Sequence, residues 1–447
     1  MPRRPHKLLT VATGLVFVCT LGGCALRQLG EDLERLDRVG RVSFTVGGER
    51  FGDHPVLAAL VSDEAMMLTV ETYGVVPATN RLTFYCPPGD YLLVAFQDIN
   101  ENRRYDRSEP FAAHGHTAPL QMWSGREIDG LTLELAPPVD ADAWSPAELV
   151  ERGFAVSPRL TDFGSVVDLD DPRFDRDAAR MGMWEPAHFI AENRAGLFLI
   201  EEYDPDKTPV VFVHGIGGSP RHFQAIIEDL DPSCQAWVFY YPSALRLQLL
   251  GDYLQLALER LRAVHHPERV VMVAHSMGGL VAWSAVRAHL RDTDEPYLDL
   301  LVTLNTPLGG MSGAAVGVDR APVVMPSWID LDPRSEYLAK LYDQPMLDDL
   351  RYVLFYGIGD NQTFPLPVPL RAALEGDIVT EGEDISDQTV PLASQLHPPA
   401  VQHVDAIHGY RATHMGILQD PAVVAQLNAV LTGADPERTP EPGHARP

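Results

Sequence analysis

The sequence predicts an α/β fold with a doubly wound, mostly parallel sheet, preceded by a small all-β sandwich domain. From about residue 183, short apolar runs rich in β-branched residues alternate with stretches of helical periodicity. That alternation is typical of buried parallel strands joined by helices. Between residues 41 and 138, short runs alternate in period two and are separated by turns, which indicates a sandwich.

Length and charge narrow the classes of function. The chain has 447 residues, of which 45% are hydrophobic, so it can form two or three domains with sizeable cores. Its formal net charge is −27, and no basic stripe interrupts the acidic composition. A surface of that sign repels nucleic acid, so we expect no nucleic-acid partner.

Residues 1–23 have the pattern of a signal peptide, with a basic start and an apolar stretch from Leu8 to Leu21. The stretch ends in Leu21-Gly22-Gly23-Cys24, which resembles the lipobox of bacterial lipoproteins. The resemblance implies cleavage before Cys24, lipidation of that cysteine, and anchoring in the bacterial cell envelope, at the outer membrane or its periplasmic face. An ordinary cleaved signal peptide is the alternative. Residues 24–40 are expected to form a tether or a short helix.

Residues 41–138 are predicted to form the sandwich domain, and residues 139–182 an acidic, turn-rich segment between domains. Candidate strands are Arg41–Val46, Val56–Val61, Met66–Tyr73, Arg81–Tyr85, Tyr91–Phe96 and Leu131–Leu135. The stretch from Pro87 to Pro110 resembles transthyretin-like or carboxypeptidase-regulatory-like modules.

One loop of the sandwich carries oxygen ligands at alternate positions, the spacing by which an EF-hand-like loop binds calcium. Arg103 stands where such a loop has glycine, and no helical pattern flanks it. A calcium site and a hairpin loop held by its own Asx hydrogen bonds are therefore both open. The five residues are Asp98, Asn100, Asn102, Asp106 and Glu109.

A candidate nucleophile follows the apolar run Val270–Ala274. The turn His275-Ser276-Met277 comes next, then two glycines, and helical spacing resumes at Leu280. A serine on so tight a strand-to-helix turn is displayed above the carboxyl end of a sheet. The N-terminus of the following helix favours developing negative charge beside it.

These residues resemble the nucleophile elbow of the α/β-hydrolase family, with Ala274 in place of the first glycine of G-x-S-x-G. The resemblance covers roughly residues 183–432 and implies the family's fold. The remaining residues, 433–447, are rich in Pro, Glu and Arg and are predicted to be disordered.

In this family the triad order along the chain is serine, acid, histidine. His414 lies in A-T-H-M-G-I-L before the last predicted helix, the place that the resemblance assigns to the catalytic histidine, and His408 is the second choice. His397 and His403 are expected to be loop residues.

Three carboxylates are candidates for the acid. Asp387 lies in S-D-Q-T-V-P, which resembles the D-x-x-V-P signature of the family and ranks first. Asp360, at the end of the preceding strand, ranks second, and Asp384 third.

The resemblance also implies an oxyanion hole, formed by the backbone N–H groups of Met277 and Ile216. Ile216 belongs to the glycine-rich loop His214–Gly218. Residues 305–310 resemble the T-P-x-x-G stretch of lipases. The apolar segment 308–345 after it could be a lid, an acyl-binding wall or a packed connector.

Together these features predict a membrane-anchored serine hydrolase of carboxylic esters, similar to lipases and esterases. It would act on an acyl-ester or lipid substrate through an acyl-enzyme on Ser276, with no required metal or organic cofactor. An acyltransferase, amidase or thioesterase would use the same residues. An inactive binding or scaffolding lipoprotein is the alternative from another class.

Overall fold

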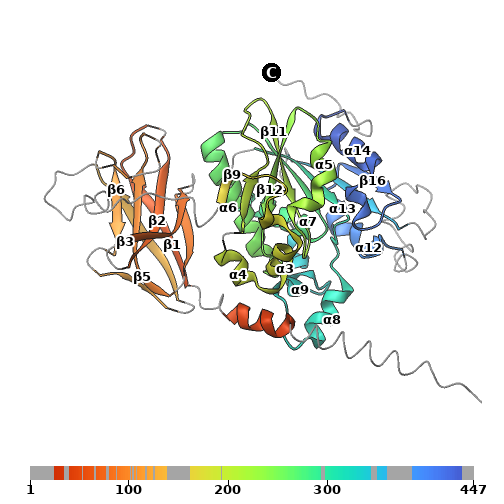
Figure 1. Cartoon of the computed structure of the whole chain (residues 1–447), viewed down its shortest axis with the longest axis horizontal. Helices are drawn as coiled ribbons and strands as arrows, with labels where there is room; N and C mark the ends of the chain where they lie inside the picture. The colour runs from red at the N-terminus through yellow and green to blue at the C-terminus, as the bar shows by residue number, and fades with distance from the viewer. Residues whose placement is uncertain are drawn as a thin grey trace, which may run out of the picture.

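A computed structural model gives two folded parts (Figure 1). A β-sandwich precedes an α/β part, and a helix over residues 25–34 lies against the α/β part. The structure describes residues 25–34, 40–52, 54–64, 67–76, 80–86, 88–100, 102, 105–106, 108–115, 118–123, 126–137, 162–192, 194–292, 297–343, 350–359 and 385–434.

The sandwich has one sheet of order β4-β1-β8 and a second of order β3-β2-β5-β6, with β7 paired to β5. Its strands are β1 (Gly40–Gly48), β2 (Val56–Glu64), β3 (Met67–Val75), β4 (Arg81–Cys86), β5 (Gly89–Gln97), β6 (Phe111–His114), β7 (Leu120–Met122) and β8 (Glu127–Leu135). Alternate residues of β1 and β2, such as Phe44 and Leu60, are buried between the sheets, as period-two patterning predicts.

The α/β part is built on an eight-stranded sheet of order β16-β15-β14-β13-β11-β12-β10-β9. All its described pairings are parallel except that between β10 and β12. The strands are β9 (Asp162–Val166), β10 (Gly196–Leu199), β11 (Thr208–Val213), β12 (Cys234–Tyr240), β13 (Val270–His275), β14 (Leu298–Leu304), β15 (Arg351–Gly357) and β16 (Ala406–Tyr410).

Helices cover both faces of this sheet, so its central strands are buried on two sides (Figure 1). One face packs against α6 (Leu247–His265), α7 (Met277–Asp292) and α10 (Glu336–Leu341). The other face packs against α3 (Arg176–Trp184), α4 (Pro186–Ala191), α5 (Gln224–Glu228) and α14 (Pro421–Leu431). The predicted doubly wound sheet and preceding all-β part are confirmed.

The predicted inter-domain segment, residues 139–182, is corrected at its C-terminal end. β9 is the edge strand of the eight-stranded sheet, and a 3-10 helix, η2 (Pro172–Phe174), inserts Phe174 into its core. Phe174 is fully buried, with its ring centroid 5.5 Å from that of Phe198 and 5.3 Å from that of Tyr240. A strand of five residues and a single turn leave no periodic pattern in the sequence.

The sandwich lies against α6 through a buried arginine. Arg260 donates a hydrogen bond to the carbonyl of Tyr73 on β3, and its guanidinium lies 4.6 Å from the ring centroid of Phe163 on β9. Leu256, one turn before it on α6, packs against the sandwich core. These contacts bring α6, β3 and β9 together, although they are far apart in the sequence.

None of the helices in the described part of the chain combines the length and the apolar character that crossing a bilayer requires.

Truncating Phe174 tests whether residues 162–182 belong to the core. Phe174→Ala should lower the free energy of unfolding by roughly 3–5 kcal/mol, because it removes a fully buried ring from between two aromatic neighbours. Urea denaturation would measure the change. The control is Phe51→Ala, since Phe51 is 48% exposed and should change stability by no more than about 0.5 kcal/mol. If both substitutions changed the free energy of unfolding by the same small amount, residues 162–182 would be a linker and not part of the core.

Candidate active site

Ser276 lies at the turn between β13 and α7, with its backbone in a strained conformation. Its φ is 55°, a value that residues with a side chain rarely adopt. The turn is fixed from both sides: the Ser276 N–H donates to the Leu304 carbonyl at 2.9 Å, and the Gly279 N–H donates to the Ser276 carbonyl at 2.9 Å. The serine is thereby held at the carboxyl edge of the sheet, above the first turn of α7.

Close packing beneath the turn explains the residues around the serine. A Cβ on Gly278 would lie 2.3 Å from the Val213 carbonyl oxygen and 2.4 Å from that of His214, so only glycine fits there. Ala274, the departure from G-x-S-x-G, is fully buried in the core on the α7 side of the sheet. The structure therefore accommodates this methyl group without opening the turn.

Ser276, His414 and Asp387 form one hydrogen-bonded series. His414 Nε2 lies 2.9 Å from Ser276 Oγ, and His414 Nδ1 lies 2.7 Å from Asp387 Oδ2. Since the carboxylate can only accept from the ring, Nδ1 carries the proton and Nε2 is left to accept from the serine hydroxyl. Geometrically, the three residues have the arrangement of a base between a nucleophile and an orienting acid.

Asp387 is completely buried, and its charge is compensated by hydrogen bonds. Oδ1 accepts from the backbone N–H groups of Thr389 at 2.8 Å and Val390 at 2.6 Å. The Asp387 backbone carbonyl accepts from the His414 N–H at 2.8 Å. The acid and the histidine are thus joined twice, once by side chains and once by backbone.

Two side chains that sequence reasoning did not assign hold the backbone of His414. Its carbonyl accepts a hydrogen bond from His275 Nε2 at 2.8 Å and lies 3.3 Å from Asn305 Nδ2. Both side chains are buried, and they come from the ends of β13 and β14. His275 directly precedes the serine and Asn305 begins the N-T-P-L-G stretch. Their places in these two motifs were the sequence features that could have indicated their role.

Burial keeps two other histidines of the site neutral. Desolvation lowers the pKa of His275 to about 3, and it lowers the pKa of His214 to about 3 as well. His214 Nδ1 lies 2.8 Å from the Gly215 carbonyl, and its ring stacks on Tyr241. At neutral pH both rings are fixed hydrogen-bonding groups, whereas His414 is the one that contacts the serine.

The two predicted oxyanion donors flank the serine. Met277 begins α7, and Ile216 lies in the loop after β11. Gly217 has a φ of 60° and donates its N–H to Ser243 Oγ at 2.9 Å, which fixes this loop. Among the described residues, neither the Ile216 nor the Met277 N–H donates to a backbone carbonyl of a loop or turn. The oxyanion hole stays a prediction.

The other histidines considered for the base are not part of this hydrogen-bonded series. His408, the second choice for the base, is buried on β16 with its ring 4.9 Å from that of Phe355. His397 lies near Tyr342, and His403 lies near Trp283. Asp360 and Asp384, the alternative acids, lie outside the described residues, as does Cys24.

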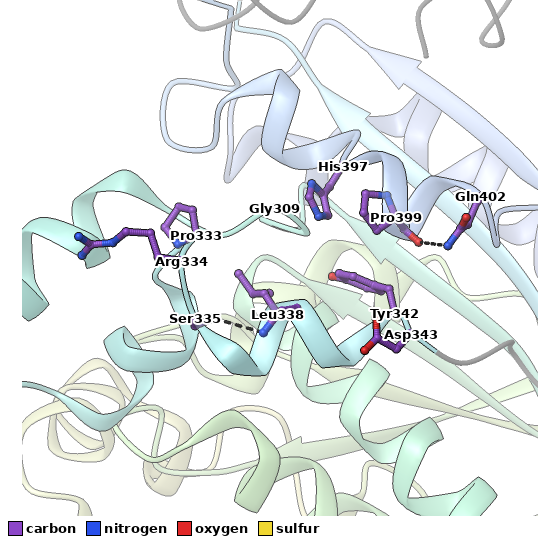
Figure 2. Close-up of a pocket in the computed structure, with 11 residues that line it drawn as sticks. Gly309, Pro333, Arg334, Ser335, Leu338, Tyr342, Asp343, His397, Pro399 and Gln402 are labelled. Carbon is purple, nitrogen blue, oxygen red and sulfur yellow. Dashed lines mark hydrogen bonds between the residues drawn. The ribbon is translucent and has the colours of Figure 1, made fainter. Parts of the chain in front are cut away.

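A surface hollow of about 430 Å³ lies beside this edge of the sheet but away from the series (Figure 2). Gly309 lies between two walls, one formed by residues from Pro333 to Asp343 and the other by His397, Pro399 and Gln402. Neither the serine, the histidine nor the acid lines it. Leu338, Leu341 and Tyr342 are buried in the core under α7, so this part of segment 308–343 packs as a connector.

The loop with the predicted calcium ligands is held by its own hydrogen bonds. Asp98 Oδ1 accepts from the Asn102 N–H at 3.0 Å, and the Glu109 carboxylate accepts from the N–H groups of Ile99 and Asp106. Asn100 Nδ2 donates to Asp106 at 2.6 Å. Among the described residues no group of three or more His, Cys, Asp and Glu is arranged to hold a metal ion. Calcium binding stays a prediction.

Comparison with known proteins agrees with this geometry. Residues 210–427 match the family model described as "Alpha/beta hydrolase family". No curated protein gave a sequence match.

Several solved structures are similar in part. The mature form of the Bacillus licheniformis lipase BlEst2 is 19% identical over 53% of this chain and 97% of its own, with a TM-score of 0.39. Aspergillus fumigatus lipase B is 16% identical over 54% and 57%, with a TM-score of 0.39. Legionella pneumophila phospholipase PlaB, in complex with thio-NAD, is 15% identical over 42% and 44%, with a TM-score of 0.33. Sequence identities and TM-scores this low do not allow the substrate of any of these proteins to be assigned to this chain.

The buried histidines predict a pH dependence of stability. Because the folded pKa of His214 and of His275 is about 3, below the ordinary 6.5, only the unfolded chain binds their protons near pH 5. Their contribution is complete above about pH 6.5 and is lost toward pH 3, at about 1.4 kcal/mol per pH unit for each histidine. Urea denaturation at pH 7.5 and pH 5 would measure the loss.

His275→Gln should reduce that loss by about half, since the amide keeps a donor and does not titrate. The matched control is His266→Asn, because His266 is exposed and its left-handed backbone suits asparagine. The same pH dependence in wild type and His275→Gln would contradict the assignment.

Proposed function

Because residues 210–427 form an α/β-hydrolase domain, we propose that this chain is a serine hydrolase that cleaves carboxylic esters through an acyl-enzyme on Ser276. The single observation that carries the proposal is the series Asp387–His414–Ser276, with contacts of 2.7 Å and 2.9 Å. A serine hydroxyl is a weak nucleophile at neutral pH unless a positioned base takes its proton. We propose His414 as that base and Asp387 as its orienting acid.

In the first half of the reaction, Ser276 Oγ attacks the carbonyl carbon of the ester while its proton passes to His414 Nε2. The carbonyl oxygen becomes an oxyanion, which the N–H groups of Met277 and Ile216 stabilise. The carbon–oxygen bond to the leaving alcohol then breaks, and His414 returns the proton to that alcohol. The acyl group remains on Ser276.

In the second half, His414 takes a proton from water, and the hydroxide oxygen attacks the acyl carbon. The bond to Ser276 Oγ breaks, the proton returns to the serine, and a carboxylic acid leaves. Asp387 supports both halves, because its negative charge stabilises the imidazolium and its hydrogen bond fixes which ring nitrogen faces the serine. This chemistry requires no metal.

We further propose that the chain is anchored to a membrane of the bacterial envelope through a lipidated Cys24. The support is the sequence Leu21-Gly22-Gly23-Cys24 after a basic and apolar leader. Such an anchor would place the hydrolase where acyl lipids are abundant, which favours a lipid or long-chain ester as substrate. Cys24→Ser should release the protein from membranes, and unchanged membrane association would argue against this anchor.

Labelling with a fluorophosphonate probe tests the nucleophile. The probe should label wild type and should not label Ser276→Ala, because only an activated serine attacks the phosphorus centre. Ser312→Ala, at an exposed serine of α8 (Ser312–Arg320), is the matched control and should label fully. A folded wild type that resists labelling would instead support an inactive binding lipoprotein. A panel of short-chain and long-chain esters would then define the acyl preference.

Asparagine substitutions at three positions test the acid. Asp387→Asn should lower kcat for a soluble ester by about 10³–10⁴-fold, because the amide no longer fixes the tautomer of His414. Asp360→Asn and Asp384→Asn are the matched controls and should keep nearly full activity. Steady-state kinetics on the three variants makes the comparison. A larger loss in either control would reassign the acid.

A further inference from the structure

The helix of residues 25–34 has one apolar face, and this face is docked on the α/β part. Leu26, Leu29 and Leu33 lie at the spacing of one helical face, and Leu29 is completely buried. On the opposite side, Arg27 and Glu31 form an exposed ion pair. A flexible tether would not bury a leucine, so this segment is a structural element.

The docking site is built from three parts of the α/β fold. Leu29 packs in one cluster with Ala244 and Met325, both fully buried, and Trp328 and Ile216 border that cluster. Asp32, which is 3% exposed, accepts a hydrogen bond from the Ala187 N–H at 2.6 Å, at the first turn of α4. Apolar burial and this buried carboxylate–amide bond together fix the helix in place.

The docked helix lies at the catalytic edge of the sheet. Ile216 and Ala244 follow the carboxyl ends of β11 and β12, and Ser276 follows the carboxyl end of β13. These strands are parallel neighbours, so all three residues lie at the same edge. Ile216 is also the proposed oxyanion donor, so the helix packs against the loop that carries this donor.

Two helices next to this one carry exposed apolar side chains. Val316 on α8 is 53% exposed, and Ile329 on α9 (Pro326–Leu331) is 39% exposed. α8 and α9 pack together, since Gly317 approaches the Trp328 ring so closely that a Cβ would lie 2.6 Å from it. In Figure 1 the helix of residues 25–34 lies next to these two helices.

The position of the proposed anchor connects these observations. Cys24 directly precedes Ala25, the first residue of the docked helix, and consecutive Cα atoms are about 3.8 Å apart. Acyl chains on Cys24 would therefore enter the bilayer within a few ångströms of the docked helix. No length of tether separates the membrane from the catalytic edge.

We propose that the helix of residues 25–34, with α8 and α9, forms a membrane-contacting surface at this edge of the sheet, and that its partner is the lipid bilayer carrying the anchor. Val316 and Ile329 enter the acyl–headgroup boundary, and the serine faces that membrane. This inference rests on the proposed anchoring at Cys24. It deepens the proposed function, because substrate esters then come from the bilayer in which the protein is anchored.

Site-specific fluorescence on the full-length lipidated protein tests the orientation. Ile329→Cys and Glu201→Cys are each labelled with an environment-sensitive nitrobenzoxadiazole dye. Glu201 follows β10, which runs antiparallel to β12, so it lies at the opposite edge and is the matched control. On incorporation into phosphatidylcholine vesicles, the dye at residue 329 should gain several-fold in intensity and shift to the blue, and the dye at residue 201 should not change. Equal responses at the two positions would overturn the proposal.

A spacer variant tests the consequence for activity. Twenty Gly and Ser residues inserted between Cys24 and Ala25 would give a flexible reach of about 25 Å. Hydrolysis of a long-chain ester dissolved in the same vesicles should fall about tenfold, with hydrolysis of a soluble short-chain ester unchanged. Unchanged hydrolysis of the vesicle ester would contradict the short fixed anchor.

Two controls separate this inference from the proposals beneath it. Flotation with vesicles checks anchoring first, and a wild type that does not float would refute the anchor and the membrane orientation with it. Fluorophosphonate labelling checks the chemistry independently of the membrane. A shifted dye at residue 329 in a protein that the probe does not label would leave the surface standing and the hydrolase proposal refuted.

Discussion

The strained backbone of Ser276 is the constraint on which the rest of the candidate active site depends. A positive φ at a residue with a side chain costs about 1–3 kcal/mol, so the surroundings must enforce it. Three strand ends do so: β14 accepts the Ser276 N–H, β13 leads into the turn, and β11 presents carbonyl oxygens against Gly278. A change in any of these strands would alter the distance between the serine and His414, because residues at the ends of β13 and β14 also hold the backbone of the histidine.

The sequence was most informative where one short segment contains the whole signal. The turn around Ser276 and the strand β13 before it were predicted because composition and spacing suffice for them. β9, β16 and η2 were missed, since short segments become regular only through pairing and burial with distant residues. The acid stayed open among three carboxylates for the same reason. Only the fold brings Asp387 against His414, through one backbone and one side-chain hydrogen bond.

Desolvation divides the histidines of the site into two kinds. Among the described residues, neither His275 nor His214 has a carboxylate partner, and their lowered pKa makes them neutral hydrogen-bonding groups at neutral pH. His414 is 13% exposed and contacts a buried carboxylate and the serine. In the proposed reaction this ring gains and loses a proton, and a counterion close by stabilises its charged form. The backbone of His414, by contrast, is held by His275, which stays neutral at neutral pH.

The N-terminal helix shows why an acidic, polar stretch need not be a tether. Of the two alternatives that the sequence left open, a tether or a short helix, the structure has the helix, and its positions give the acidic residues different environments. Glu31 pairs with Arg27 on the exposed face, whereas Asp32 is turned inward and is compensated by the Ala187 N–H. Leu29 is completely buried and Leu26 and Leu33 are partly buried, so the helix docks by apolar contact, and the hydrogen bond from Ala187 offsets the cost of burying the carboxylate. Because the cluster they join includes Ile216, the segment nearest the proposed anchor and the loop proposed to stabilise the oxyanion share one set of packing contacts.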